Sequence, residues 1–310
     1  MMWPRCSTQN SGMTLIEVIL ALGLFALMSV FLTQTISSVL GIWQAGERRG
    51  RGDLVWAATA SRFASDLDAI HLGRRGWLIL DTWEASPANE QNPAQILPRL
   101  RFLARGEAVD FDGSPERGAV ELAWVLMPET DDYGSLRRLV RLSQPENKID
   151  SSMSFQNDSY FTALLRGGAG MTVVDSVAWC AFTTEGLTQS SASTAFIAPR
   201  EPVDFPQWVG LQLERVDAAS RRKPHHLDDA ISASPTPLTL RGQAPTHDLG
   251  FVLIEGEWMR LSGQWPTYQA SLRGLRNSNA AAHERGAIVW LPDTFQGQWP
   301  LPSSGRRLNR

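Results

Sequence analysis

The chain is poor in cysteine. Its 310 residues include only two cysteines, Cys6 and Cys180. Small secreted domains without a large hydrophobic core depend on several disulfides, and two cysteines cannot build such a framework. Cys180 stands in the apolar run 177–182, which is typical of a buried structural thiol. The sequence therefore excludes a disulfide-rich fold and argues against a thiol-based active site.

A strong net charge is also missing. The chain carries 29 basic and 32 acidic residues, for a formal charge of -3 at pH 7. Such a balance gives no global attraction to nucleic acid or to anionic lipid, so no nucleic-acid partner is expected. Hydrophobic residues make up 43% of the chain, which predicts a folded protein with one large domain or two smaller ones.

Charged residues are absent altogether between Val18 and Gly46. The stretch from Met13 to Leu32 holds 20 residues, and Glu17 is its only ionisable side chain. A helix of that length crosses about 30 Å of hydrocarbon, so we expect a membrane anchor. A carboxylate at the membrane costs roughly 2.5 to 3.5 kcal/mol on insertion scales, which predicts that Glu17 has a partner charge.

The residues before Glu17 indicate what that partner is. They read Gly12-Met13-Thr14-Leu15-Ile16. A cut between Gly12 and Met13 would place a new α-amino group about one helical turn, or roughly 6 Å, before Glu17. This stretch resembles the processing site of type IV prepilins and type II secretion pseudopilins. In that family a glycine precedes the cut, a glutamate is fifth in the mature chain, and the first mature residue is usually an N-methylated Phe, where this chain has Met13.

The resemblance implies a role for each of these residues. Residues 1–12 are expected to be a leader peptide that a prepilin peptidase removes, with Gly12 as the processing determinant. Met13 becomes the mature, methylated N-terminus, and Glu17 pairs with the N-terminal amine of a neighbour during assembly. The implied partners are the peptidase and other pseudopilins or pilins in a hetero-oligomeric filament.

The resemblance also predicts the location of the protein. We expect a single-pass protein of the bacterial inner membrane whose globular part lies in the periplasm. The basic residues Arg48, Arg49 and Arg51 outnumber Arg5 on the other side of the apolar stretch, which opposes the positive-inside tendency for this orientation. We follow the resemblance of the cleavage site and keep the expectation that the globular part lies in the periplasm.

A second helical pattern follows the apolar segment of residues 13–43. Within residues 44–71, an apolar stripe recurs every three or four residues and comprises Trp56, Ala60, Phe63, Leu67 and Ile70. Arg62, Asp66 and Asp68 lie off this stripe, which predicts an amphipathic helix docked on a globular domain. Glycines at 41, 46, 50 and 52 each lower helix propensity by about 1 kcal/mol relative to Ala, so we expect a bend or a melted turn between the two helices.

Short apolar runs separated by turn-forming residues begin after His71, which predicts mainly antiparallel β structure. The expected strands are 77–80, 97–103, 120–127, 136–142, 171–182, 208–216, 251–254, 258–261, 268–272 and 287–291. The clearest pair is 120–127 with 136–142, because the intervening residues are rich in turn formers. We therefore predict an α+β fold in which a long N-terminal helix packs on a pilin-like β domain of residues 72–217.

Three pieces of this region resemble the J-class minor pseudopilin of type II secretion systems. They are the helix ending at 62–67, the hairpin with 123–126 and 139–142, and the proline-led strand at 206–213. The resemblance implies a minor pseudopilin, a structural subunit distinct from the major pseudopilin.

Residues 218–246, with the basic run 221–226 and Pro235-Thr236-Pro237, are expected to form a linker or long loop. An extra β-rich segment, 247–310, should follow. Its hairpin around Glu255 and Glu257, its Arg273-Gly274 turn and its late His283 resemble a short β module of phage tail and other surface-assembly proteins. That resemblance implies assembly contacts, not catalysis.

Candidate chemistry is sparse. A metal site at His225, His226, Asp228 and Asp229 needs three or four converging ligands, and a charged loop is the commoner explanation. Asp131 and Asp132 lack the spacing of a calcium loop. His283 could act as a base beside Glu255 or Glu257, but no nucleophile accompanies it, and hydrogen bonding in a β turn is its expected role. We expect no enzyme activity, catalytic residue, metal or cofactor.

The expected function is that of a minor pseudopilin in the periplasmic pseudopilus of a type II secretion-like system. One alternative is a minor pilin of a type IV pilus or DNA-uptake filament, which shares the anchor. Another, of a different class, is a membrane-tethered adhesin or hydrolase built on residues 220–310.

Overall fold

The structure is a computed structural model. It describes residues 15–72, 76–86, 95–109, 115–129, 136–146, 150–185, 187–189, 196–198, 205–234, 237–242, 244–245, 250–276 and 278–302. The chain divides into two compact units, Met1–Arg51 and Gly52–Arg310, which are described separately.

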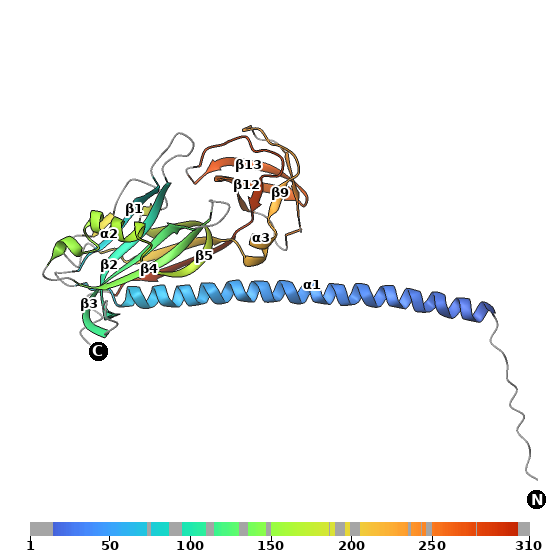
Figure 1. Ribbon diagram of the computed structural model, residues 1–310, viewed down its shortest axis with the longest axis horizontal. Coiled ribbons are helices and arrows are strands. Elements are labelled where there is room, and N and C mark those ends of the chain that lie inside the picture. The colour runs from blue at the N-terminus through green and yellow to red at the C-terminus, as the bar shows by residue number, and fades with distance from the viewer. Residues whose placement is uncertain are drawn as a thin grey trace, which may run out of the picture. The chain divides into compact units, whose positions relative to one another are not determined.

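One helix, α1 (Leu15–Asp68), supplies all the described structure of the first unit and enters the second (Figure 1). It is helical through all four glycines between residues 41 and 52, so the expected melted turn is wrong. A single glycine costs only about 1 kcal/mol in a helix, and helix-forming residues such as Ala45, Glu47 and Arg48 lie among these glycines. The boundary predicted at residues 43 and 44 is therefore not a break in the helix.

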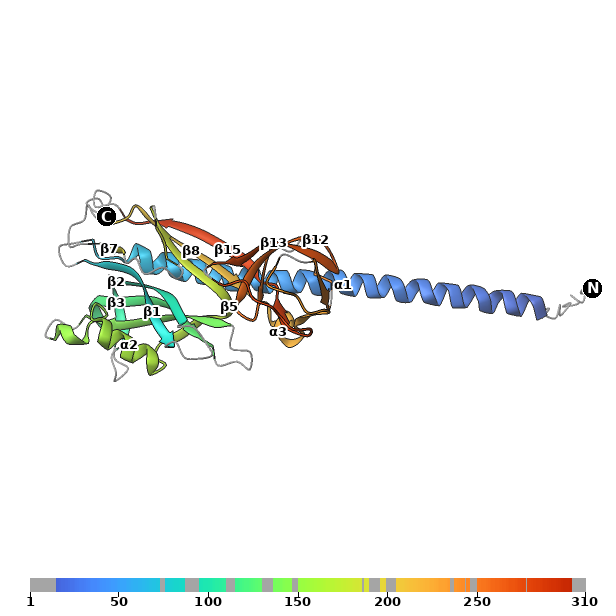
Figure 2. The ribbon, with the colours of Figure 1, turned by 90° about the horizontal axis from the view of Figure 1, so that it is seen from above.

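The second unit contains a nine-stranded antiparallel sheet. Its strands are β1 (Leu78–Ser86), β2 (Gln95–Val109), β3 (Pro115–Pro128), β4 (Arg137–Pro145), β5 (Met171–Thr184), β6 (Leu187–Gln189), β7 (Phe196–Ala198), β8 (Trp208–Arg215) and β15 (Asp293–Pro300). They are ordered β15-β8-β5-β4-β3-β2-β1-β7, and β6 pairs with β5 beside this path. Figure 2 shows β15 next to β8, although the two are far apart in the sequence. The predicted α+β class is confirmed at this level.

The short 3-10 helix η1 (Ser151–Met153) and the helix α2 (Asp158–Arg166) lie between β4 and β5 in the sequence. Asn157 caps α2, because its side-chain oxygen accepts from the backbone N–H groups of Ser159 at 3.1 Å and Tyr160 at 3.3 Å. Phe161 and Leu165, one turn apart, are the buried residues of α2. This helix was not predicted.

A second group of strands closes into a six-stranded barrel, ordered β10-β13-β12-β11-β14-β9 (Figures 1 and 2). Its strands are β9 (His225–Leu227), β10 (Pro237–Arg241), β11 (Phe251–Ile254), β12 (Glu257–Gln264), β13 (Thr267–Leu275) and β14 (Ile288–Trp290). A short helix, α3 (Ala218–Arg222), precedes it. The barrel has its own core, which includes Leu227, Leu240, Val252, Met259 and Val289.

The barrel is inserted in a hairpin of the main sheet. β8 and β15 pair along eight consecutive residues, from Trp208 with Pro300 to Arg215 with Asp293, and the whole barrel lies between them in the sequence. Two predictions are therefore wrong. The segment 218–246 is not a linker, because it provides β9, β10 and buried core residues such as Leu238. The segment 247–310 is not one β unit, because its last strand, β15, belongs to the main sheet.

The ten predicted strands all correspond to observed strands, and the predicted hairpin is β3 with β4. The strands that the pattern missed are β6, β7, β9, β10 and β15. Four of them have only three or five residues, which is too short for a period of two to emerge.

Candidate functional site

The first part of α1 is the feature that sets this chain apart from a globular protein. Between Val18 and Leu40 the helix has 23 residues with a mean hydropathy of 2.1, and none of its most apolar stretch is buried inside the structure. Phe25 and Leu27 are each 73% exposed. Within the described residues, this is the one helix long and apolar enough to cross a membrane.

Two threonines of this stretch satisfy their hydroxyl groups within the helix. The hydroxyl of Thr33 donates to the carbonyl of Ser29 at 2.8 Å, and that of Thr35 donates to the carbonyl of Phe31 at 2.9 Å. Each hydroxyl is thus satisfied by its own helix without water, as a membrane-spanning segment requires.

The predicted processing residues Gly12 and Met13 lie outside the described residues. The backbone of Glu17 lies in the first turn of α1, which begins at Leu15. Glu17 directly precedes the apolar span Val18–Leu40.

The last part of α1 packs against the main sheet along the predicted stripe. Phe63 and Leu67 of α1, and Ile70 just after its end, have at most 1% of their surface exposed. The ring of Phe63 lies edge-on to Trp124 at 5.1 Å and to Trp299 at 4.9 Å between centroids, and Trp56 stacks on Phe295 at 5.4 Å. Edge-to-face and offset contacts of this kind stabilise packing beyond the area they bury. The predicted amphipathic docking is confirmed.

Asp66 is a functional residue that the pattern missed. Expected on the solvent side of the helix, it is only 5% exposed. Its Oδ2 accepts from the indole nitrogen of Trp124 at 2.9 Å and from Nε of Arg141 at 2.6 Å, and its Oδ1 accepts from Arg141 at 2.9 Å. Trp124 and Arg141 are directly opposite each other on β3 and β4. An arginine inside a predicted strand was the signal that an acid had to meet it.

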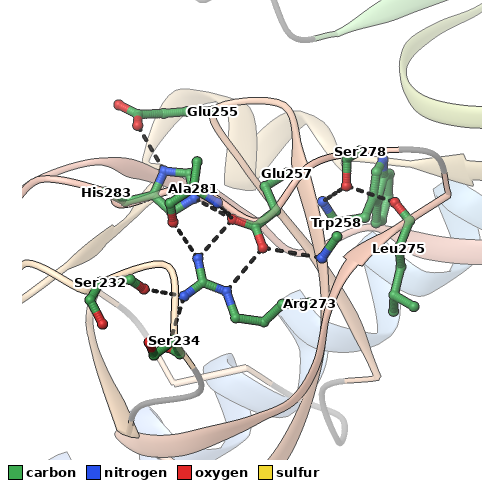
Figure 3. Close-up of polar contacts among 11 residues, drawn as sticks. Ser232, Ser234, Glu255, Glu257, Trp258, Arg273, Leu275, Ser278, Ala281 and His283 are labelled. Carbon is green, nitrogen blue, oxygen red and sulfur yellow. Dashed lines mark hydrogen bonds and ion pairs between the residues drawn. The ribbon is translucent and has the colours of Figure 1, made fainter.

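The barrel holds a compact polar cluster around Glu257 (Figure 3). Glu257 is 2% exposed, and Arg273 binds both its carboxylate oxygens, at 3.0 and 2.8 Å. The backbone N–H groups of Gly274 and Ala281 donate to it at 3.2 and 2.9 Å. Burial raises the pKa of Glu257, but the hydrogen bonds from Arg273, Ala281 and His283 and the charge of Arg273 outweigh burial and lower the pKa below its ordinary value.

His283 lies between the two glutamates named from the sequence. Its Nδ1 is 2.9 Å from Glu255 and its Nε2 is 2.9 Å from Glu257. The predicted proximity of these three residues and the hydrogen bonding of His283 are confirmed, but His283 stands in a β-bridge with Ile231 and not in a β turn.

A second ion pair joins the barrel to the sheet. Arg276, which follows β13, forms a bidentate ion pair with Glu214 of β8. The Glu214 residue is fully buried. The guanidinium of Arg276 lies 4.2 Å from the rings of Trp179 and Trp258 and 4.6 Å from that of Phe251. Cation–π contacts are strong when desolvated, so this aromatic cage fixes the inserted barrel to the sheet.

The described residues contain no group of three His, Cys, Asp or Glu side chains that could hold a metal ion. The predicted candidates are dispersed: the ring of His225 is edge-on to Trp265, and Nδ1 of His226 is 2.9 Å from the carbonyl of Gly286. Asp131 and Asp132 lie outside the described residues. Cys180 is buried as predicted, and burial raises the pKa of its thiol, which disfavours the nucleophilic thiolate.

Comparisons with protein-family models, with curated proteins and with solved structures find no match to this chain. The arrangement of its residues therefore carries the functional argument. It consists of an apolar helix that runs into a β domain and of polar contacts that fasten the parts of that domain to one another.

Proposed function

We propose that this protein is a membrane-anchored, pilin-like structural subunit, and specifically a minor pseudopilin of a type II secretion-like system. The observation that carries the proposal is the double character of α1. One continuous helix is apolar on all sides over Val18–Leu40 and amphipathic over its last turns, where it packs on an antiparallel sheet. A subunit assembled through its N-terminal helix needs both parts.

The fastening of α1 to the sheet supports a mechanical role. A subunit that is drawn from a membrane into a filament experiences force on the helix, and the β domain must follow. The buried pair of Asp66 with Arg141 and the ring cluster around Phe63 join helix and sheet by specific contacts rather than by apolar burial alone. No catalytic role is proposed for any residue.

In this proposal the mature chain begins at Met13, and Glu17 pairs with an N-terminal amine. Mass spectrometry of the protein purified from a host with an active prepilin peptidase tests the first point. The expected N-terminal peptide begins with methylated Met13. A protein that still carries residues 1–12 in that host contradicts the proposal.

Replacement of Glu17 tests the second point. Glu17→Ala should leave cleavage intact and reduce copurification with partner pseudopilins, because an assembling helix then lacks the carboxylate that neutralises the neighbour's amine. Asp53→Ala is the matched control, since Asp53 is an exposed acid on the same helix. Equal recovery of partners with both variants refutes the assembly role of Glu17.

A further inference from the structure

His283 is a buried titratable residue that the proposed function does not use. It lies between β13 and β14, and its backbone pairs with Ile231 through two hydrogen bonds of 2.9 Å, one in each direction. The residue is 4% exposed. Its backbone is therefore fixed by this bridge, and its side chain is buried.

Both ring nitrogens face carboxylates. Nδ1 is 2.9 Å from Oε2 of Glu255, and Nε2 is 2.9 Å from Oε2 of Glu257 (Figure 3). A neutral imidazole has one donor and one acceptor nitrogen, whereas an ionised carboxylate only accepts. Both contacts are hydrogen bonds only when both nitrogens carry a proton, which means that the ring is an imidazolium.

The two carboxylates differ in how firmly they are held. Glu257 accepts from Arg273 and from the backbone N–H groups of Gly274 and Ala281, so it stays ionised and keeps the Nε2 proton of His283 in place. The side chain of Glu255 is 54% exposed, and His283 is its one described hydrogen-bond partner. Loss of the proton on Nδ1 of His283 therefore affects the contact with Glu255.

Glu255 occupies a turn that it does not favour by itself. The hairpin between β11 and β12 has only two connecting residues, Glu255 and Gly256, with φ of 47° and 93°. Such turns need positive φ at both positions, which Asn, Asp and Gly accept more readily than Glu. The contact with His283 thus compensates a turn residue in the left-handed region.

We propose that His283 is a protonation switch that fastens the β11–β12 turn. As an imidazolium it donates to Glu255 and Glu257 together. When Nδ1 loses its proton, its lone pair faces the carboxylate of Glu255, the contact becomes repulsive, and the turn is released. The inference is independent of the pseudopilin assignment.

Other charges near the switch are engaged elsewhere. Arg273 of β13 binds Glu257 and the backbone carbonyls of Ser232, Ser234 and Ala281. Arg285, two residues after His283, is 3.9 Å from Asp228. These described contacts do not involve the imidazole, so the two glutamates are the groups that sense its proton.

Nitrogen NMR of the full-length chain, with ¹⁵N-labelled histidine rings, reads the switch directly. The resonance of His283 is assigned by its loss in His283→Gln. In the wild type we expect two protonated ring nitrogens in acid and loss of the Nδ1 proton as the pH is raised. A single protonated nitrogen at every pH of the series overturns the proposal.

Hydrogen exchange at the turn reads the consequence. After correction for intrinsic rates, protection of the amides at 255–257 should fall about two- to fivefold as His283 loses its proton, the effect of a half-exposed ion pair. In Glu255→Gln the amide can donate or accept, so protection should not change with pH. Glu284→Gln, an exposed neighbour of His283, is the control and should behave as wild type. Equal pH dependence in the wild type and Glu255→Gln refutes the switch.

Discussion

The two parts of α1 place similar side chains in opposite surroundings. Phe25 is 73% exposed, whereas Phe63, on the same helix, is completely buried. Leu27 and Leu67 differ in the same way, at 73% and 1%. The first part is apolar on all sides, and the second has a single apolar stripe with polar residues between. An amphipathic helix finds its partner within the chain, while one that is apolar on all sides needs an apolar environment from elsewhere.

The comparison explains why one continuous helix carries two tasks. In the last part of α1, stability comes from packing and from the buried Asp66 contacts with β3 and β4. In the first part, nothing in the described structure covers the apolar side chains. The parts should therefore respond differently to the same substitution.

The largest expected contrast comes from truncating one phenylalanine in each part. Phe63→Ala removes a buried ring from a cluster with Trp124 and Trp299 and should lower the free energy of unfolding of the β domain by about 3 to 5 kcal/mol. Phe25→Ala should leave it unchanged. Denaturant unfolding of the full chain in detergent, followed by tryptophan fluorescence, measures both. Comparable losses in the two variants would contradict the division of α1.

Removal of the Asp66 carboxylate tests how much the buried polar contacts of α1 contribute to stability. Asp66→Asn leaves the guanidinium of Arg141 half-buried without its counter-charge, and breaking such a pair should cost about 3 to 4 kcal/mol of stability. Asp53→Asn, on an exposed position of the same helix, should have little effect. The same denaturant melts compare the variants. If Asp66→Asn unfolds at the same denaturant concentration as the wild type, the contact of Asp66 with Arg141 does not stabilise the domain.

Sequence patterns succeeded where structure is local. The helical stripe from Trp56 to Leu67 and ten of the strands follow from apolar periodicity and turn residues. The barrel was missed because its closure depends on distant pairings: β9 meets β10 and β14, and its paired residues in β14 lie 62 and 64 positions later in the sequence. A three-residue strand such as His225–Leu227 carries no period of its own.

The site residues show the same division. Glu255, Glu257 and His283 were grouped correctly because the first two share a hairpin and the third is a rare residue type in its segment. Asp66 was misplaced because an acid is ordinarily solvated, and only the position of Arg141 across the sheet reverses that expectation. The partnership of Glu214 with Arg276 depends on how the inserted barrel meets β8, which no local pattern encodes.

A charge introduced into each part of the helix gives a smaller but sharper contrast. Leu27 and Leu54 are 73% and 70% exposed on the same helix. Leu27→Arg should disfavour membrane insertion by about 2.5 to 3.5 kcal/mol, because the charge falls within the apolar span. Leu54→Arg should be tolerated, because it lies beyond that span. Alkaline extraction of isolated membranes measures the retained fraction, and equal retention of both variants would refute a spanning segment at Val18–Leu40.

The smallest effect is a pH dependence of the β domain, to which the span Val18–Leu40 cannot contribute because it has no acidic or basic residue. Glu121 of β3 is 2% exposed, and burial raises its pKa above the ordinary 4.5 despite hydrogen bonds from Ser154, Phe155 and Gln144. The folded state therefore holds this proton more tightly than the unfolded chain does. Its contribution to stability is present in acid and is lost as the pH rises from about 4.5 through the raised pKa.

Glu121→Gln removes that titration. The variant should show a weaker fall in the free energy of unfolding over this acid range, whatever its absolute stability, because a glutamine has no proton to lose. Glu84→Gln, an exposed acid on β1, should keep the wild-type slope. Urea melts at a series of pH values give the slopes. An unchanged slope in Glu121→Gln would mean that burial does not favour the protonated carboxyl, and the pH response of the domain would have to come from other buried acids.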